Sequence, residues 1–182
     1  MAPQINIIDA GGNNICYVRQ KIMKLKEQIE VFTDKNKNEK ICEIRANKVL
    51  DFSATYQFFD ANGQPFGAVA RKGMKSLWKA HYDILDGETV VMNVREENPW
   101  VKVLDGLLGQ IPIVGMITGY LFNPSYIISN ASTNEPLVRI KKIPAFLEGK
   151  FVIDKIGNFE QEEEMKMVVS TIMIVLLERT RG

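Results

Sequence analysis

The sequence predicts a mainly β fold of the α+β class, in which a closed antiparallel barrel of repeated hairpins encloses a hydrophobic C-terminal helix. Three observations favour it. Apolar and polar residues alternate along many short segments, a hairpin-like unit recurs, and the last apolar run has the length and flanks of a helix. The 182 residues fit one domain, 1–182, of ordinary size.

Period-two alternation predicts the strands, because it places one face of a strand in a core and the other in water. Polar turns separate the alternating runs, such as Asp-Ala-Asn-Gly at 60–63, which is rich in residues that tolerate tight-turn backbone angles. The predicted core faces are formed by Phe52, Ala54, Tyr56 and Phe58, by Trp78, Ala80, Tyr82 and Ile84, and by Val90, Met92 and Val94.

A hairpin unit recurs along the chain. Residues 56–72 resemble residues 126–142, because each stretch has an aromatic residue, a short strand, a polar turn, a proline, a second strand and two basic residues. A weaker copy spans 29–45. Repetition suits a closed, quasi-symmetric sheet, because closure removes exposed strand edges. The repeat also predicts that Arg71-Lys72 and Lys141-Lys142 lie at equivalent ends of two hairpins.

The segment between the two better copies has a different character. Asn98-Pro99 has the pattern of a helix cap followed by proline, so one additional helix is expected near 99–110. Residues 111–122 carry no charge, and their proline and glycines disfavour a regular helix. We interpret 111–122 as a buried connection, with exposure for membrane or partner contact as the alternative.

The C-terminal apolar run, 165–177, predicts a helix buried within the protein. Glutamates precede it and arginines follow it, which matches the helix dipole. At roughly 1.5 Å per residue the run spans about 20 Å, short of the ~30 Å core of a bilayer. Its second half is apolar on all sides, which is typical of an enclosed helix.

Four features in order carry a resemblance to a known family. They are Tyr-Val-Arg-Gln-Lys-Ile at 17–22, the turn at 60–63, Gly-Tyr-Leu-Phe-Asn-Pro-Ser-Tyr at 119–126, and the closing helix. Together they resemble the LURP-one-related family of the tubby-like superfamily, which also holds the phospholipid scramblases. The resemblance implies an antiparallel barrel threaded by its C-terminal helix. It also implies binding of phosphoinositide headgroups at membranes, as in tubby domains.

The sequence departs from the scramblases in two ways. It lacks their long N-terminal extension, and residues 151–157 carry one acidic residue instead of an Asp-x-Asp calcium loop. Scramblase activity is therefore not expected.

Composition disfavours several function classes. Lys plus Arg is 23 and Asp plus Glu is 22, which argues against nucleic acid as a partner. Two cysteines without a CxxC pair and a single histidine make a metal site improbable, and we expect no cofactor. His81 falls on the polar face of a strand, so we expect no catalytic residues and no enzyme activity. Reduced thiols and the absence of a signal-peptide pattern predict a cytoplasmic location, with peripheral membrane attachment as an extension of it.

Basic clusters are the candidate binding residues. Arg139 and Lys141 share a strand face opposite Val138 and Ile140, so they are expected to point outward. The alternative is an ordinary solvated face. The predicted function is a non-enzymatic module that recognises anionic phospholipid headgroups, or else an intracellular scaffold or protein-partner domain without lipid affinity. The candidate residues for a headgroup or other anion are Arg71, Lys72, Arg139, Lys141 and Lys142.

Overall fold

A computed structural model describes residues 4–22, 27–46, 54–71, 81–97, 125–143 and 149–179. The additional helix expected near 99–110, and the 111–122 segment, lie outside these residues. The mainly β prediction is confirmed by the elements found: β1 (Gln4–Ile8), β2 (Asn14–Ile22), β3 (Glu27–Phe32), β4 (Lys40–Ala46), β5 (Thr55–Asp60), β6 (Pro65–Arg71), β7 (His81–Asp86), β8 (Thr89–Glu96), β9 (Ser125–Asn130), β10 (Pro136–Ile143), β11 (Lys150–Lys155) and α3 (Gln161–Arg179).

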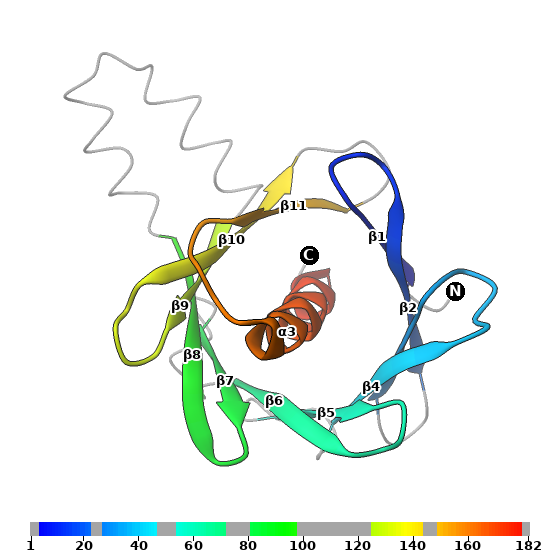
Figure 1. The fold of residues 1–182 in the computed structure, drawn as a ribbon, viewed down its shortest axis with the longest axis horizontal. Helices are drawn as coiled ribbons and strands as arrows, with labels where there is room; N and C mark the ends of the chain where they lie inside the picture. The colour runs from blue at the N-terminus through cyan, green and yellow to red at the C-terminus, as the bar shows by residue number, and fades with distance from the viewer. Residues whose placement is uncertain are drawn as a thin grey trace.

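The eleven strands form one sheet in which each strand pairs antiparallel with the next in sequence. The sheet curls around α3, which lies on its concave side (Figure 1). One end of the sheet, here called the turn end, carries the link into α3 at 156–160 and the turns at 9–13, 33–39, 60–64, 86–88 and 130–135. The helix begins at the turn end and runs toward the opposite end.

Closure of the sheet into a barrel is not confirmed. The hydrogen-bonded order runs from β1 to β11, and no ladder joins these two edge strands within the described residues. Strand parity gives a physical reason. In an antiparallel meander every odd-numbered strand runs in the same direction, so direct pairing of β1 with β11 would be a parallel ladder in an otherwise antiparallel sheet.

The inward faces of the strands and α3 form one hydrophobic core. The described members of the first two predicted core faces are confirmed, because all of them are buried. The third predicted core face, formed by Val90, Met92 and Val94, is wrong at Val90. A register shift between Ile84 and Leu85 inserts an extra residue in β8, so Val91 packs against the core while Val90 is 37% exposed. The confirmed core residues are Ala54, Tyr56, Phe58, Tyr82, Ile84, Met92 and Val94.

The predicted C-terminal helix is confirmed and is longer than its apolar run. The glutamates before the run form the first turn, where the carbonyl of Glu160 accepts the backbone N–H groups of Glu163 and Glu164. The carboxylate of Glu163 accepts the backbone N–H of Glu160 at 3.2 Å, which satisfies a donor in the manner of a capping box. Residues 169–176 are all buried, as expected for an enclosed helix.

The start of α3 packs against β6. A Cβ atom added at Gly67 would lie 3.1 Å from the carbonyl oxygen of Leu85 and 3.5 Å from Cγ of Lys166. The ammonium of Lys166 pairs with Asp86 in the β7–β8 turn. The first turns of α3 are therefore held on the β6 side of the concave face.

The link from β11 into α3 generates the first prediction. A Cβ at Gly157 would lie 2.6 Å from the carbonyl oxygen of Pro136, a backbone atom that cannot move aside cheaply. Gly157→Ala is expected to lower the free energy of unfolding by about 1–3 kcal/mol, measured by urea denaturation. Gly11→Ala is the control, because its Cβ would meet only flexible side chains. Equal stability of the two variants would contradict the close approach at 157.

Candidate functional site

Arg139 and Lys141 lie side by side on the convex face of β10. Their neighbours Val138 and Ile140 are 4% and 0% exposed and face the core, so the prediction that the two cations point outward is confirmed. Both cations are half-buried.

The ion pairs of these two cations are loose. Nε of Arg139 lies 3.3 Å from Oε1 of Glu97, yet this buried nitrogen has no hydrogen-bond partner, so the contact has poor geometry for donation. Nζ of Lys141 lies 3.8 Å from Oδ2 of Asp154, and these two side chains are 43% and 45% exposed. The exposed Lys141–Asp154 pair contributes roughly 0–1 kcal/mol, whereas the side chain of Glu97 is only 13% exposed. A phosphate could therefore replace Asp154 beside Lys141 at little cost.

Strand pairing adds a third cation that sequence reasoning missed. Arg95 pairs with Ile127, which in turn pairs with Arg139, so the two arginines face outward two strands apart. At about 4.8 Å between strands, their backbones are roughly 10 Å apart. Alternation along residues 89–96 predicts an outward Arg95, but only the register places it beside β10. The term convex patch is used below for Arg95, Arg139 and Lys141.

Arg71 and Lys142 lie on the other side of the sheet. Arg71 pairs with the buried Tyr82, and Lys142 pairs with Phe151, so both cations belong to the concave face. The four described candidates therefore lie on two faces of the sheet. Lys72 lies outside the described residues.

A single extra residue explains why Arg71 shares its face with Lys142 and not with Lys141. The two repeat copies are the β5–β6 and β9–β10 hairpins, and they end together at the same end of the sheet, as predicted. Their turns differ, because Asp60 bonds Gln64 in the first, whereas Asn130 bonds Glu135 in the second. The longer second turn makes Lys142, not Lys141, the structural equivalent of Arg71. A one-residue offset moves a side chain to the opposite face.

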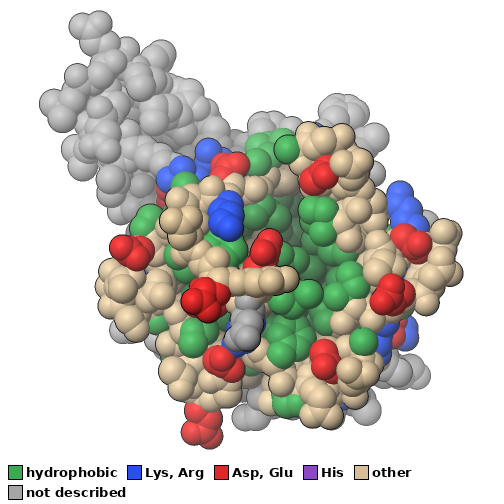
Figure 2. All heavy atoms as spheres, viewed as in Figure 1, with side chains coloured by type: hydrophobic (Ala, Val, Ile, Leu, Met, Phe, Trp, Pro, Cys, Tyr) green, Lys and Arg blue, Asp and Glu red, His purple; other side chains and the backbone are tan. Residues whose placement is uncertain are grey.

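The charges of the chain are separated between the two ends of the sheet. The five turns and the 156–160 link carry eight carboxylates and two lysines, and Figure 2 shows acidic side chains spread over this end. The three residues of each strand nearest the opposite end include seven basic and three acidic side chains: Lys21, Arg45, Arg71, Arg95, Lys141, Lys142 and Lys150 against Glu27, Asp83 and Glu96.

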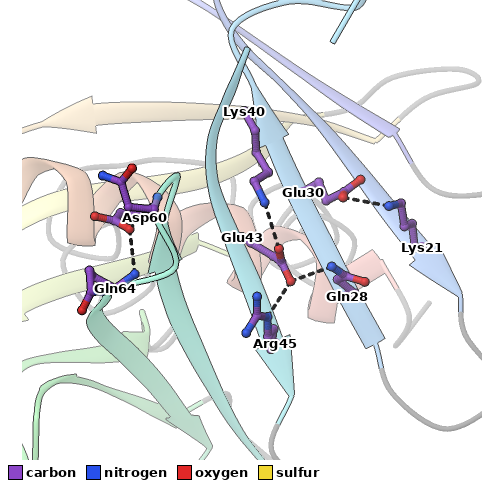
Figure 3. A network of polar contacts seen from close by, with 9 residues as sticks. Lys21, Gln28, Glu30, Lys40, Glu43, Arg45, Asp60 and Gln64 are labelled. Carbon is purple, nitrogen blue, oxygen red and sulfur yellow. Dashed lines mark hydrogen bonds and ion pairs between the residues drawn. The ribbon is translucent and has the colours of Figure 1, made fainter. Parts of the chain in front are cut away.

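Part of the basic charge is neutralised on the convex face of β2–β4 (Figure 3). Lys21 pairs with Glu30 at 2.7 Å. Glu43, only 3% exposed, accepts hydrogen bonds from Gln28 and Arg45 at 2.6 Å each and from Lys40 at 3.2 Å. Burial raises the pKa of Glu43, but these hydrogen bonds outweigh burial and hold the pKa below its ordinary value of 4.5. This network is a structural element that leaves the convex patch as the better anion site.

The two thiols and the histidine give no sign of reactivity. Burial raises the pKa of Cys16 to about 11 and that of Cys42 to about 12, so neither is a thiolate near neutral pH. Nε2 of His81 lies 4.0 Å from Oδ1 of Asp83 on the convex face. Within the described ranges no three His, Cys, Asp or Glu side chains are grouped as a metal site would require.

The hairpins of the first half of the chain fall within a match to a family model. The model described as LURP-one-related matches residues 14–107, just over half of the chain. The chain belongs to the LURP-one-related family. The match covers β2 to β8, and so includes the first of the two better hairpin copies and Arg95.

Comparisons with curated proteins and with solved structures find no match to this LURP-one-related chain. In the part of the chain that the structure describes, no helix has the length and apolar character needed to cross a membrane.

The Glu43 network generates a prediction on pH. A carboxyl whose pKa is lower in the folded state stabilises the fold above its unfolded pKa and loses that contribution as pH falls through its folded pKa. Glu43→Gln is expected to lower the free energy of unfolding by about 1–3 kcal/mol at neutral pH. Urea titrations from neutral to acid pH should show the deficit shrinking below pH 4.5. Glu88→Gln in an exposed turn is the control, and a pH-independent deficit would contradict this role for Glu43.

The thiols generate another prediction. Cys16 and Cys42 should react slowly with an aromatic disulfide reagent in the native protein at neutral pH, and rapidly in denaturant, because only unfolding exposes them and restores an ordinary thiol pKa. Absorbance of the released thiol measures both rates. Rapid labelling of the native protein would contradict their enclosure.

Proposed function

We propose that this LURP-one-related domain is a binding module that recognises anionic phospholipid headgroups at a membrane surface through the basic end of its sheet. The observation that supports this most is the separation of charge along the sheet. The net charge is only +1, but carboxylates collect at the turn end and cations at the opposite end.

A charge distribution of this kind orients the molecule. An anionic surface attracts the basic end and repels the turn end, so a protein with almost no net charge can still bind in one orientation. Each Lys or Arg near an anionic leaflet contributes about 1 kcal/mol, and this attraction fades within a Debye length of about 8–10 Å.

The convex patch supplies the closest contacts in this proposal. Nε of Arg139 is buried beside Glu97 without a hydrogen-bond partner, while the side chain as a whole is 34% exposed. The loose pair between Lys141 and Asp154 leaves an ammonium free to move to a phosphate oxygen. Arg71 and Lys142 extend the positive potential along the concave rim of the same end.

We propose binding rather than catalysis as the activity, at the cytoplasmic leaflet and as a peripheral association. The raised pKa values of both described thiols support this, since they disfavour either as a nucleophile. A protein partner is the second candidate, because hydrophobic side chains remain exposed at the two edge strands.

Co-sedimentation with liposomes tests the lipid proposal. Binding to vesicles containing phosphatidylserine or phosphoinositides should exceed binding to neutral phosphatidylcholine vesicles and should weaken as salt rises. Arg139→Ala and Lys141→Ala should each reduce affinity about fivefold, and the double variant about 25-fold, from roughly 1 kcal/mol per cation.

Lys35→Ala is the matched control, because Lys35 is an exposed cation at the turn end. Its affinity should equal that of the unaltered protein. Salt-independent binding, or an equal loss in Lys35→Ala, would contradict recognition by the basic end. Absence of binding to anionic vesicles at low salt would overturn the proposal.

A further inference from the structure

The turn between β5 and β6 carries an Asn-Gly pair, Asn62-Gly63, and the sequence has no other. Both residues are exposed, and Gly63 has a left-handed backbone with φ of +81°. Asparagine is a thermolabile residue, because the backbone nitrogen that follows it can attack its side-chain carbonyl carbon. A glycine in the next position has no Cβ atom to hinder this attack. The pair is therefore a candidate site of spontaneous chemical modification.

The reaction at this pair needs water and no other reactant. The backbone nitrogen of Gly63 bonds to Cγ of Asn62, and the side-chain nitrogen of Asn62 leaves as ammonia with the proton that Gly63 loses. A five-membered succinimide ring results, and water then opens it at one of its two carbonyl carbons. Opening at Cγ gives aspartate, whereas opening at the main-chain carbonyl gives isoaspartate, in which the backbone runs through the side chain and is one atom longer. Each product carries one more negative charge than asparagine.

The hydrogen bonds of the turn restrain the attacking nitrogen. The N–H of Gly63 donates to the carbonyl of Asp60 at 3.0 Å, so this nitrogen is not free to lose its proton. Oδ1 of Asp60 accepts the backbone N–H of Asn62 at 2.9 Å and that of Gln64 at 2.7 Å, and the second of these bonds is drawn in Figure 3. The N–H of Asp60 donates to the carbonyl of Gln64 at 2.9 Å. The backbone is thus fixed on both sides of the reacting peptide bond.

A second pair of this type in the described turns, Asp86-Gly87, is protected in a different way. The carboxylate of Asp86 pairs with the ammonium of Lys166. Ring formation from aspartate needs the protonated acid, because the departing oxygen leaves as water. An ion pair that favours the carboxylate therefore disfavours the reaction at Asp86. Asn62 has a neutral amide that no ion pair protects, so only the geometry of its turn limits the reaction.

We propose that Asn62-Gly63 is a deamidation site whose rate is controlled by the hydrogen bonds of Asp60. While the turn is closed, the nitrogen of Gly63 is held by the carbonyl of Asp60 and the pair reacts slowly. Local opening of the turn releases this nitrogen and lets the ring form. Deamidation places a further carboxylate at the turn end and lowers the net charge of +1 by one.

The two products differ in their effect on the fold. Aspartate at position 62 keeps the backbone of the turn, so the register of β5 with β6 is retained. Isoaspartate lengthens the backbone between Asp60 and Gln64, whose groups are bonded at 2.7 and 2.9 Å, so the turn cannot keep both bonds. Since β6 carries Gly67 beside Lys166 of α3, isoaspartate is expected to loosen the start of the helix as well.

Ageing of the purified full-length chain at mildly alkaline pH tests this proposal. Anion-exchange chromatography follows the added charge, peptide mapping by mass spectrometry locates it, and labelling with an isoaspartyl methyltransferase measures the isoaspartate. We expect Asn62 to be modified before any other asparagine. The reaction should be about tenfold faster in urea than in the native protein, because unfolding breaks the hydrogen bonds of the turn. Asp60→Ala should raise the native rate toward the rate in urea, because it removes the acceptor of two N–H groups.

Asp60→Asn is the matched control. Its side-chain oxygen can accept the same two hydrogen bonds, so it should keep the slow rate. Asn62→Ser should abolish the acidic form. Amide hydrogen exchange of Gly63 should rise in parallel with deamidation across the variants, because both reactions need the same opening.

Four outcomes would overturn the proposal. They are equal rates in native and urea-unfolded protein, earlier modification of another asparagine, an unchanged rate in folded Asp60→Ala, and deamidation that does not follow the exchange of Gly63. If Asp60→Ala does not fold, the comparison of the native protein with Asp60→Asn and with the urea-unfolded chain still decides whether the closed turn controls the rate.

Discussion

Burial of α3 is the constraint on which the rest of the structure depends. From Val169 to Leu176 the helix has no side that water can cover, because every residue in that stretch is buried. A flat sheet covers only one side of a helix, so the strands have to curl around it. Their inward residues must be apolar, and the start of α3 packs beside Gly67 of β6. Functional polar groups are consequently confined to the convex face, the two ends and the unclosed edges.

Local patterns in the sequence were sufficient for the core but not for the site. Alternation identified Tyr56, Tyr82 and Ile140 as inward residues because burial of one strand face needs no knowledge of the partner strand. Two predictions failed for the same reason: the inward orientation of Val90, and the equivalence of Arg71 with Lys141 in the two repeat copies. A single extra residue, in β8 or in the 130–135 turn, reverses the face of everything beyond it, and composition does not reveal where such a residue is accommodated.

Arg95 shows the complementary limit. Its neighbours in sequence predict an outward cation, but its proximity to Arg139 comes from two successive ladders and so depends on the register of three strands. The unpaired edges of the described sheet also could not be predicted from local patterns. Whether an antiparallel meander can close on itself depends on whether its number of strands is even or odd, and no local pattern gives that number.

The separated charges have two different origins. At the turn end, carboxylates have local tasks: Asp9 accepts the N–H of Asn13, Asp34 those of Asn36 and Lys37, and Asp60 those of Asn62 and Gln64. At the start of α3, the carboxylate of Glu163 accepts a backbone N–H, and the negative charge of the glutamates complements the helix dipole. Turn and helix chemistry therefore account for the negative end. Neither turn nor helix-end chemistry places Arg95, Arg139 and Lys141 on the convex face of β8 and β10, although Arg139 and Lys141 lie within ion-pair distance of Glu97 and Asp154. Among them, the exposed Arg95 and the weakly paired Lys141 carry the stronger implication of a ligand.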